Sequence, residues 1–492
     1  MRKRLLLITS SFEEVSLITA SSRQGKGLKI DENTHYPLGL AYLHSYLEYK
    51  GNEVKTLFLN HINYTDCFAK FKEEIKNFSP EFICFQMLTA NRVSTYELIE
   101  YVHMNYPKIK IVLGGIHATI LYKQLVEKFP YIIVVIGEGE ITFSELIKEL
   151  SKKRPNLGKI DGIAFCSDSK VIVTKQRELI NDLDQLPFPK HEIFFESKNR
   201  IRGNILTTRG CPFNCSFCCL DTISRGRVRK RSVGNIVTEV EWMIKKFPTM
   251  DTIWIHDDSF LLDNQRVINF CNEVIIRKIK VSFICSARVK PLSEQLVKKM
   301  EEANFKLVLF GVESGSEDIL RKCHKGITKN DILRAVKLFS KSKIMFSIFL
   351  IVGLPGENIK TIKETIAFTK KLQKIKYFYF SEDVAVLTVY PGTEVYELAK
   401  SIDAINDDYW LSKEPTPLFT IENNKERLFY FKDILLNNIS LDRFFTFNGF
   451  VHQYRMLPHI VRYFIKNFKF FLDNRKIIMK KILNIFRLSR ND

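Results

Sequence analysis

Short apolar runs alternate with helix-like segments along this chain, and this alternation constrains the fold more than any other feature. In the first 150 residues, strand-like runs at 5–8, 54–59, 82–86, 109–113 and 132–136 are separated by helix-like segments at 38–50, 67–77 and 96–105. Such βα alternation with short connections predicts an α/β fold with an open, doubly wound parallel sheet of Rossmann-like type.

A second βα series follows, with strand-like runs at 204–207, 252–255, 282–286, 307–310, 347–352 and 385–388. These repeats, spread over some 200 residues, fit a partial (β/α)6 TIM-like barrel better than a second open sheet. The proline-rich residues 186–190 mark a boundary between the two series, because proline fixes an extended chain.

At 492 residues, the chain exceeds the roughly 250–300 at which one hydrophobic core stops growing. We therefore expect four parts. The first domain occupies 1–150, and a connector at 151–200 carries short strands at 162–165 and 171–174. The barrel occupies 201–400, and a helical, basic C-terminal region occupies 401–492.

Glycines follow two of the strands predicted in the first domain. Gly114 and Gly115 come after the run at 109–113, and Gly137 and Gly139 come after the run at 132–136. Open parallel sheets bind ligands at the carboxyl ends of their strands, where glycine lets the backbone approach a ligand closely. The pattern alone is equally compatible with plain turn glycines.

Four of the ten cysteines crowd into nine residues, as Cys211, Cys215, Cys218 and Cys219, whereas the other six are scattered among apolar neighbours as small buried side chains. The C-x3-C-x2-C spacing directly follows a predicted strand. Three thiolates that are close in sequence suit an iron–sulfur cluster, whereas a closed zinc site needs four donors. Cys219 could supply a fourth, but adjacent loop residues rarely point at one metal.

The C-x3-C-x-aromatic-C pattern resembles the signature of the radical S-adenosylmethionine (SAM) enzymes. The resemblance implies that Cys211, Cys215 and Cys218 bind a 4Fe–4S cluster whose open iron chelates SAM, and that Phe217 lies against the adenine. Cys219 has no counterpart in the motif, so we expect it to be structural.

The resemblance continues at the ends of later strands. It implies SAM contacts from the Asp-Asp-Ser-Phe, Ala-Arg, Gly-x-Glu-Ser-Gly and Gly-Leu-Pro-Gly-Glu segments, and the 390–393 turn closes the series. The side chains and glycines expected to contact SAM are Asp257, Arg288, Glu313, Ser314, Gly315, Gly353, Pro355 and Glu357. Physically, Arg288 can pair with the SAM carboxylate and Glu313 can accept hydrogen bonds from ribose hydroxyls.

The N-terminal half resembles the cobalamin-binding domain of one large branch of that family, through residues 36–41, 114–119, 137–140 and 186–189. The contacts that this resemblance implies for cobalamin are Leu38, Gly39, Gly114, Gly115, His117, Thr119, Gly137, Glu138 and Gly139. The D-x-H-x-x-G motif is absent, so no protein histidine is expected below the cobalt. His117 is either a corrin or phosphate contact or a satisfied turn histidine.

The chain carries a net charge of +20, and its last 42 residues hold ten Lys and Arg against two Asp. Apolar residues recur at helical spacing in this tail, at Val461, Phe464, Ile465, Phe468 and Leu472. Such a stripe packs on its own protein, lies on an anionic membrane or contacts nucleic acid. Nucleic acid is disfavoured because no helix-turn-helix, RNA-recognition or zinc-finger signature is present. Without a secretory signal or a long apolar run, we expect a cytoplasmic protein whose tail is the candidate membrane contact.

These features together predict an anaerobic radical SAM enzyme that transfers a methyl group to an unactivated carbon or phosphorus. The resemblance implies that one SAM methylates the cobalt of cobalamin and that a second SAM gives the 5′-deoxyadenosyl radical. Two alternatives stay open: a cobalamin-linked oxidation, cyclisation or rearrangement, and a non-catalytic cobalamin or redox sensor. The expected partners are a small-molecule or lipid substrate and an electron donor such as flavodoxin or ferredoxin.

Overall fold

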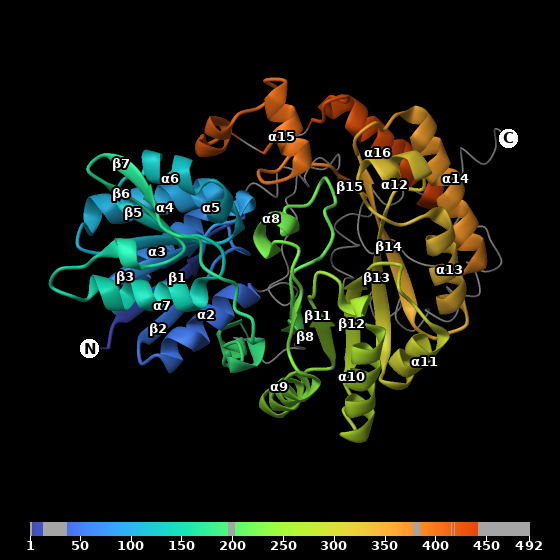
Figure 1. The fold of residues 1–492 in the computed structure, drawn as a ribbon, viewed down its shortest axis with the longest axis horizontal. Coiled ribbons are helices and arrows are strands. Elements are labelled where there is room, and N and C mark those ends of the chain that lie inside the picture. The colour runs from blue at the N-terminus through green and yellow to red at the C-terminus, as the bar shows by residue number, and fades with distance from the viewer. Residues whose placement is uncertain are drawn as a thin grey trace, which may run out of the picture.

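The computed structural model describes residues 2–12, 37–194, 202–376, 384–414, 416–417 and 419–440. They form two α/β domains that lie side by side, with the short helix α8 (Leu220–Ser224) between them (Figure 1). The predicted fold class is confirmed: an open sheet is followed by a half-barrel.

The N-terminal sheet has seven strands in the order β2-β1-β3-β4-β5-β6-β7. Five are parallel, namely β1 (Arg4–Thr9), β2 (Glu53–Phe58), β3 (Phe82–Gln86), β4 (Lys110–Gly114) and β5 (Ile132–Val135). The two strands expected in the connector, β6 (Ile163–Ser167) and β7 (Lys170–Val173), extend this sheet as an antiparallel hairpin. The first domain therefore takes in part of the predicted connector.

Helices cover both faces of this sheet, as the near-continuous apolar strands require. In β1, Leu5 and Leu7 face α2 (Leu38–Tyr49) and α7 (Gly139–Leu150), whereas Leu6 and Ile8 face the opposite layer. That layer consists of α3 (Tyr64–Phe78), α4 (Arg92–Asn105) and α6 (Tyr122–Lys128). Between β4 and α6 lies the short helix α5 (Ile116–Ile120).

The second sheet has six parallel strands arranged in sequence order from β8 to β15. Its strands are β8 (Arg202–Ile205), β11 (Thr252–Ile255), β12 (Ser282–Ala287), β13 (Phe305–Glu313), β14 (Met345–Val352) and β15 (Ala385–Val386). The connecting helices are α9 (Val233–Lys246), α10 (Asn264–Ile276), α11 (Glu294–Glu302), α12 (Glu317–Lys322), α13 (Lys329–Ser340) and α14 (Ile359–Ile375). One hydrophobic core joins strands and helices.

After the barrel, the chain returns to the first domain through α15 (Glu394–Ser401) and the 3-10 helix η6 (Asp407–Leu411). Tyr396 and Trp410 are buried in the core of the N-terminal sheet, although more than 250 residues separate them from most of it. The Tyr96 hydroxyl donates to the Trp410 carbonyl at 2.9 Å, and Gln124 donates to Asp407 at 2.8 Å. The domains are thus linked at both ends of the barrel.

The last described helix, α16 (Lys425–Ser440), lies against α14 and the β14–β15 edge of the barrel. The basic tail at 451–492, with the apolar positions Val461 to Leu472 expected to form a stripe, lies outside the described residues. Among the described residues, no helix combines the length and the apolar character needed to cross a bilayer.

Candidate active site

The carboxyl edges of the two sheets face a shared cavity of about 360 Å³, the interdomain cavity. The first domain contributes the turns after its strands, and the second contributes the loop after β8. The predicted cobalamin contacts on the wall are Gly39, Gly114, Gly115, Gly137, Glu138 and Gly139, and the residues opposite them include Thr208, Arg209, Gly210, Arg229 and Asp258. The structure thus brings six of the nine predicted cobalamin contacts to one surface.

The glycines of this wall leave room for a large flat ligand. A Cβ added at Gly114 or Gly137 would meet no atom within 4 Å, so the space in front of both is open. Gly115 has a φ of +97°, and an added Cβ would lie 2.7 Å from the Met87 carbonyl oxygen. The amide oxygen of Gln86, also on the wall, is buried without a hydrogen-bond partner. An amide-bearing corrin fits such a wall, because its amides can satisfy that oxygen.

The other three predicted cobalamin contacts lie behind the wall. Leu38 packs on Ala41 and Phe194, and the Thr119 hydroxyl accepts the Gly137 amide at 3.0 Å. His117 is buried, with Nδ1 3.0 Å from the Thr89 hydroxyl, and burial with the nearby Arg92 charge lowers its pKa to about 3. Thr119 therefore supports the turn at Gly137, whereas His117 is held by Thr89 and its Nε2 is buried without a hydrogen-bond partner.

The cluster loop connects β9 (Thr208–Arg209) to α8 and carries the predicted ligands Cys211, Cys215 and Cys218. Cys215 is buried and the other two are half-buried. Burial, together with the neighbouring thiols, raises the pKa of Cys218 to about 11. In the described part of the chain, no three His, Cys, Asp or Glu side chains converge as ligands of a single metal ion. A cubane cluster needs a wider spacing, because each thiolate binds its own iron.

Two backbone contacts hold the middle of the cluster loop. The Ser216 amide donates to the Cys323 carbonyl, and the Ser216 carbonyl accepts from Val395, both at 3.1 Å. Cys219 is the N-cap residue of α8, and its side chain makes no capping hydrogen bond.

The adjacent acids Asp257 and Asp258 have different partners. The Asp257 carboxylate accepts from the amides of Thr207 at 2.6 Å and Thr208 at 3.0 Å. Asp258 accepts from the Gly210 amide at 3.1 Å and lies on the cavity wall. Asp257, expected near the SAM amino group, therefore anchors the start of the cluster loop, and the sequence did not single out Asp258 as the acid of the cavity. An acid pair after a strand does not reveal which member turns inward.

Arg288 is placed to receive an anion beside the cluster loop. Its Nη1 lies 3.6 Å from the Cys215 sulfur, and its guanidinium lies 3.7 Å from the centre of the Phe213 ring. Its Nε and Nη2 are buried without hydrogen-bond partners. Unpaired guanidinium donors are costly to bury, so this geometry fits the expected pairing with the SAM carboxylate.

Glu313 lies in a buried ion pair that the sequence did not predict. Its carboxylate is 2.7 Å from Lys325 Nζ, and both side chains are less than 10% exposed. Lys325 also lies 5.7 Å from the centre of the Phe217 ring, so the pair reaches the expected adenine contact. Gly311 makes room, because a Cβ there would lie 2.6 Å from the Glu313 carboxylate. A lysine preceding a glycine in a loop carries no sequence signal of its own.

The remaining predicted SAM contacts form two braced turns. Thr365 holds the first, because its hydroxyl lies 3.1 Å from that of Ser314 and accepts the Gly315 amide at 3.0 Å. In the second, which includes Pro355, the Glu357 carboxylate accepts the Gly353 amide, and burial raises the Glu357 pKa to about 8. Both turns therefore have fixed backbones before any ligand binds.

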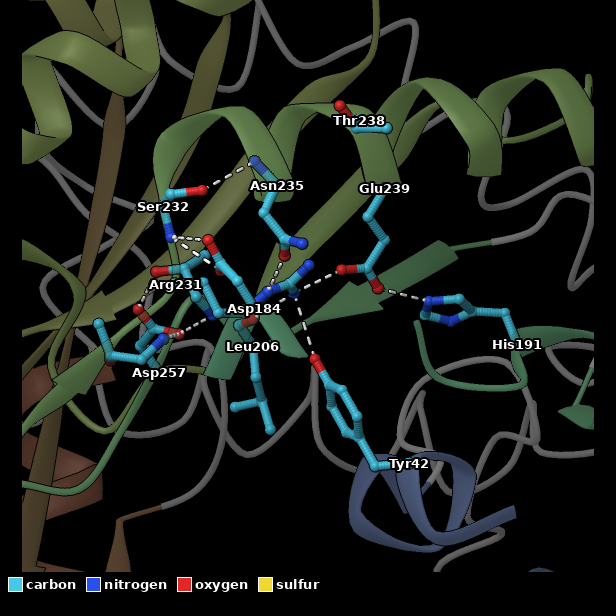
Figure 2. A network of polar contacts seen from close by, with 12 residues as sticks. Tyr42, Asp184, His191, Leu206, Arg231, Ser232, Asn235, Thr238, Glu239 and Asp257 are labelled. Carbon is cyan, nitrogen blue, oxygen red and sulfur yellow. Dashed lines mark hydrogen bonds and ion pairs between the residues drawn. The ribbon is translucent and has the colours of Figure 1, made fainter. Parts of the chain in front are cut away.

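A buried polar network joins the two domains behind the cavity (Figure 2). Arg231 contacts Glu239 at 2.5 Å and the hydroxyl of Tyr42, on α2 of the first domain, at 3.2 Å. The far oxygen of Glu239 lies 2.8 Å from His191 Nε2. Arg266 then connects the Arg231 carbonyl to the Thr207 carbonyl, where the cluster loop begins.

An open sheet facing a half-barrel, with three cysteines in the first barrel loop, defines a two-domain radical enzyme. Comparison with known families agrees: residues 205–369 match the radical SAM superfamily, and residues 31–147 match the B12 binding domain. The chain belongs to the radical SAM superfamily, in the group whose members carry a B12-binding domain. The family implies a 4Fe–4S cluster and SAM, and the first domain implies cobalamin.

Similar proteins include the uncharacterized methyltransferase PH0819 of Pyrococcus horikoshii, 31% identical over 74% of this chain and 78% of that protein. The anaerobic magnesium-protoporphyrin IX monomethyl ester cyclase of Rubrivivax gelatinosus is 28% identical, over 67% of this chain and 61% of the cyclase. Among solved structures, the cobalamin-dependent SAM radical enzyme OxsB superposes with a TM-score of 0.70 at 18% identity, over 99% of this chain and 75% of that one. The SAM methyltransferase TsrM from Kitasatospora setae gives 0.65 at 17% identity, over 82% and 79%.

Proposed function

We propose that this enzyme transfers a methyl group from SAM to an unactivated carbon or phosphorus of its substrate. One observation carries the proposal: β9 and Gly210, which lead directly into the cluster loop, lie on the wall of the same cavity as the glycine turns of the B12-binding domain. Methyl transfer of this kind needs both cofactors at one substrate, and the shared cavity provides that arrangement.

When bound, the cluster and SAM supply a 5′-deoxyadenosyl radical, and cobalamin supplies the methyl group. The protein binds and orients these groups. Cys211, Cys215 and Cys218 would hold the cluster, Arg288 would donate from its unpaired Nε and Nη2 to the SAM carboxylate, and Glu313 would accept hydrogen bonds from the ribose hydroxyls. Gly114 and Gly137 would leave space for the corrin, and the buried amide oxygen of Gln86 would accept a hydrogen bond from one of its amides.

The corrinoid and iron content of one anaerobic preparation tests this proposal. The full chain is expressed with hydroxocobalamin supplied, and corrinoid is measured by mass spectrometry alongside iron. We expect near-stoichiometric corrinoid with about four irons per chain. Iron without corrinoid would contradict methyl transfer from cobalamin and leave a cobalamin-free radical reaction.

Radical oxidation or ring closure is the second candidate, because cyclases stand among the relatives. The two reactions differ in the products they leave from SAM. Methyl transfer releases S-adenosylhomocysteine together with 5′-deoxyadenosine, whereas ring closure releases 5′-deoxyadenosine alone. Chromatography of these products separates the candidates once a substrate is turned over.

We further propose that a flavodoxin- or ferredoxin-type protein reduces the cluster.

We also propose that the basic tail at 451–492 contacts anionic membrane. Such a contact would favour a lipid substrate. The tail's surplus of positive charge supports membrane contact. Co-sedimentation of the full chain with phosphatidylserine vesicles at low salt tests the contact, and an unbound full-length protein would contradict it.

A further inference from the structure

One arginine joins the loop that carries the cluster ligands to the turn that lines the cobalamin side of the cavity. Arg209 lies in β9, two residues before Cys211. Its Nη1 donates to Glu138 at 2.8 Å and its Nη2 donates to Glu140 at 2.6 Å. Glu138 is the N-cap residue of α7 and Glu140 lies in the first turn of that helix, beside the glycines Gly137 and Gly139. The two arms of one guanidinium are therefore fixed by one segment of the other domain.

A second arginine reinforces this contact from the neighbouring strand. Arg229 of β10 (Arg229–Lys230) pairs with Arg209 across a short antiparallel ladder, and its Nη1 donates to Glu138 at 2.7 Å. The Ile180 amide donates to the same carboxylate at 2.8 Å. We call Arg209, Arg229, Glu138 and Glu140 the interdomain clasp.

The clasp is part of the cavity wall itself. All four of its side chains line the cavity, yet none is more than 16% exposed. The Arg209 guanidinium also lies 5.0 Å from the centre of the Tyr42 ring on α2. Buried pairs of this kind add little net stability, but removing one partner leaves an uncompensated charge. The clasp therefore fixes the position of the β9–β10 ladder relative to Glu138 and Glu140, and adds little to the stability of the fold.

We propose that Arg209 is a positioning residue that couples the cobalamin turn to the cluster loop. The inference rests on the proposed function, and it goes further by assigning the alignment of the two cofactor sites to one side chain. The fork of an arginine reaches both carboxylates at once, whereas a lysine reaches one. Loss of Arg209 leaves Glu138 and Glu140 with surplus negative charge on the wall, so the turn shifts and cobalamin binds more weakly. The three cysteines are untouched.

The experiment compares Arg209→Met and Arg209→Lys with Arg231→Lys, all as reconstituted full-length protein. Arg231 is the control, because it is even more deeply buried than Arg209 and also crosses to the first domain through Tyr42, but it does not line the cavity. Iron content, thermal midpoint and the Kd for hydroxocobalamin, from equilibrium dialysis with absorbance detection, are measured for each.

For Arg209→Met we expect wild-type iron and a cobalamin Kd raised about 10-fold or more, in the range of typical site couplings. Arg209→Lys should fall between wild type and Arg209→Met. Arg231→Lys should lower the thermal midpoint and leave the cobalamin Kd within about twofold of wild type. With a substrate in hand, Arg209→Met should also release less S-adenosylhomocysteine for each 5′-deoxyadenosine formed.

Wild-type cobalamin affinity in Arg209→Met would overturn the inference while the proposed function stands. An equal loss of affinity in Arg231→Lys would also overturn it, since general docking would then explain the effect. A wild-type chain that binds no cobalamin would overturn both. If Arg209→Met fails to fold, the Glu138→Gln, Glu140→Gln double variant tests the same contacts from the other side, and it should give the same loss of affinity.

Discussion

The carboxyl edges of the two sheets face one cavity, but they present opposite kinds of surface to it. The N-terminal sheet ends in glycines with open space before Gly114 and Gly137. The barrel contributes the charged side chains Arg209, Arg229 and Asp258 to the wall, each held by hydrogen bonds, and Arg288 lies beside the cluster loop. The edge of the N-terminal sheet provides room for the flat corrin of cobalamin, and the barrel edge provides charged partners for SAM.

The difference follows from what each ligand requires. A corrin presents a wide surface with amides at its rim, so a large side chain at a glycine of the sheet edge would displace it. The methionyl end of SAM carries a carboxylate and an amine, so charged partners fixed in advance lower the cost of binding. The clasp at Arg209 is the point where the charged edge reaches into the glycine edge.

The largest effect should come from the cluster ligands of the barrel edge. Replacing Cys211, Cys215 or Cys218 with Ser removes a thiolate, so iron should fall from about four per chain to near zero. Cys219→Ser is the matched control and should keep the iron, because Cys219 lies outside the three-cysteine motif, at the N-cap position of α8. Iron analysis and the 400-nm absorbance give the result, and an iron-free Cys219→Ser would make Cys219 a ligand.

On the glycine edge, Gly114→Leu should fill the cavity without disturbing the fold. The added Cβ meets open space, and the remaining side chain then occupies the volume expected for the corrin. We expect cobalamin affinity to fall about 100-fold with iron unchanged, since a clash at a flat wall cannot be repacked. Gly114→Ala serves as control and should bind within about threefold of wild type. Undiminished binding by Gly114→Leu would place the corrin elsewhere.

A substitution at Arg288 can separate the effect of its positive charge from the effect of its planar guanidinium. Arg288→Lys keeps the cation but loses the fork, so SAM affinity should fall about 10- to 100-fold, as for the loss of one charge-assisted hydrogen bond. Iron must be measured with it, because Arg288 also contacts the Cys215 sulfur. Calorimetric titration of SAM into cluster-loaded protein measures the change. A variant with full iron and unchanged affinity would remove Arg288 from the SAM site.

Much of this arrangement could be predicted from the sequence because both edges follow from regular spacing. The strand runs, the glycine turns and the three cysteines lie at the ends of βα units, and βα units place those ends together. The place of the hairpin β6–β7 in the N-terminal sheet was harder to predict, because short strands in a connector do not reveal which sheet they join.

Three contacts depend on how the chain folds back on itself. Lys325 pairs with Glu313 across α12, Glu140 is joined to Arg209, and Trp410 packs in the core of the first domain. Each of these contacts depends on tertiary packing, so the spacing of residues along the sequence does not predict it. The choice between Asp257 and Asp258 likewise depends on which way one residue of a turn points.

The buried acid Glu357 should make the barrel edge sensitive to pH. Its pKa is raised to about 8 by burial, so the folded state holds a proton that the unfolded state loses near pH 4.5. Stability therefore falls as pH rises from about 5 to about 8. Glu357→Gln mimics the protonated acid and should be more stable than wild type by about 2 kcal/mol at pH 8.5, with little difference at pH 5. Urea unfolding at both values measures this, and a pH-independent difference would show that the carboxyl does not titrate there.

The smallest effect should come from beneath the glycine edge, at Thr119. Its hydroxyl accepts the Gly137 amide at 3.0 Å, and Thr119→Val keeps the shape but removes the acceptor. We expect a loss of about 1 kcal/mol in unfolding free energy, the usual value for one hydrogen bond, and a rise of only a few-fold in the cobalamin Kd. Thr119→Ser should restore both, since it keeps the hydroxyl. If Thr119→Val instead abolished cobalamin binding with its stability intact, the hydroxyl would be a direct corrin contact, and the glycine edge would carry polar recognition of its own.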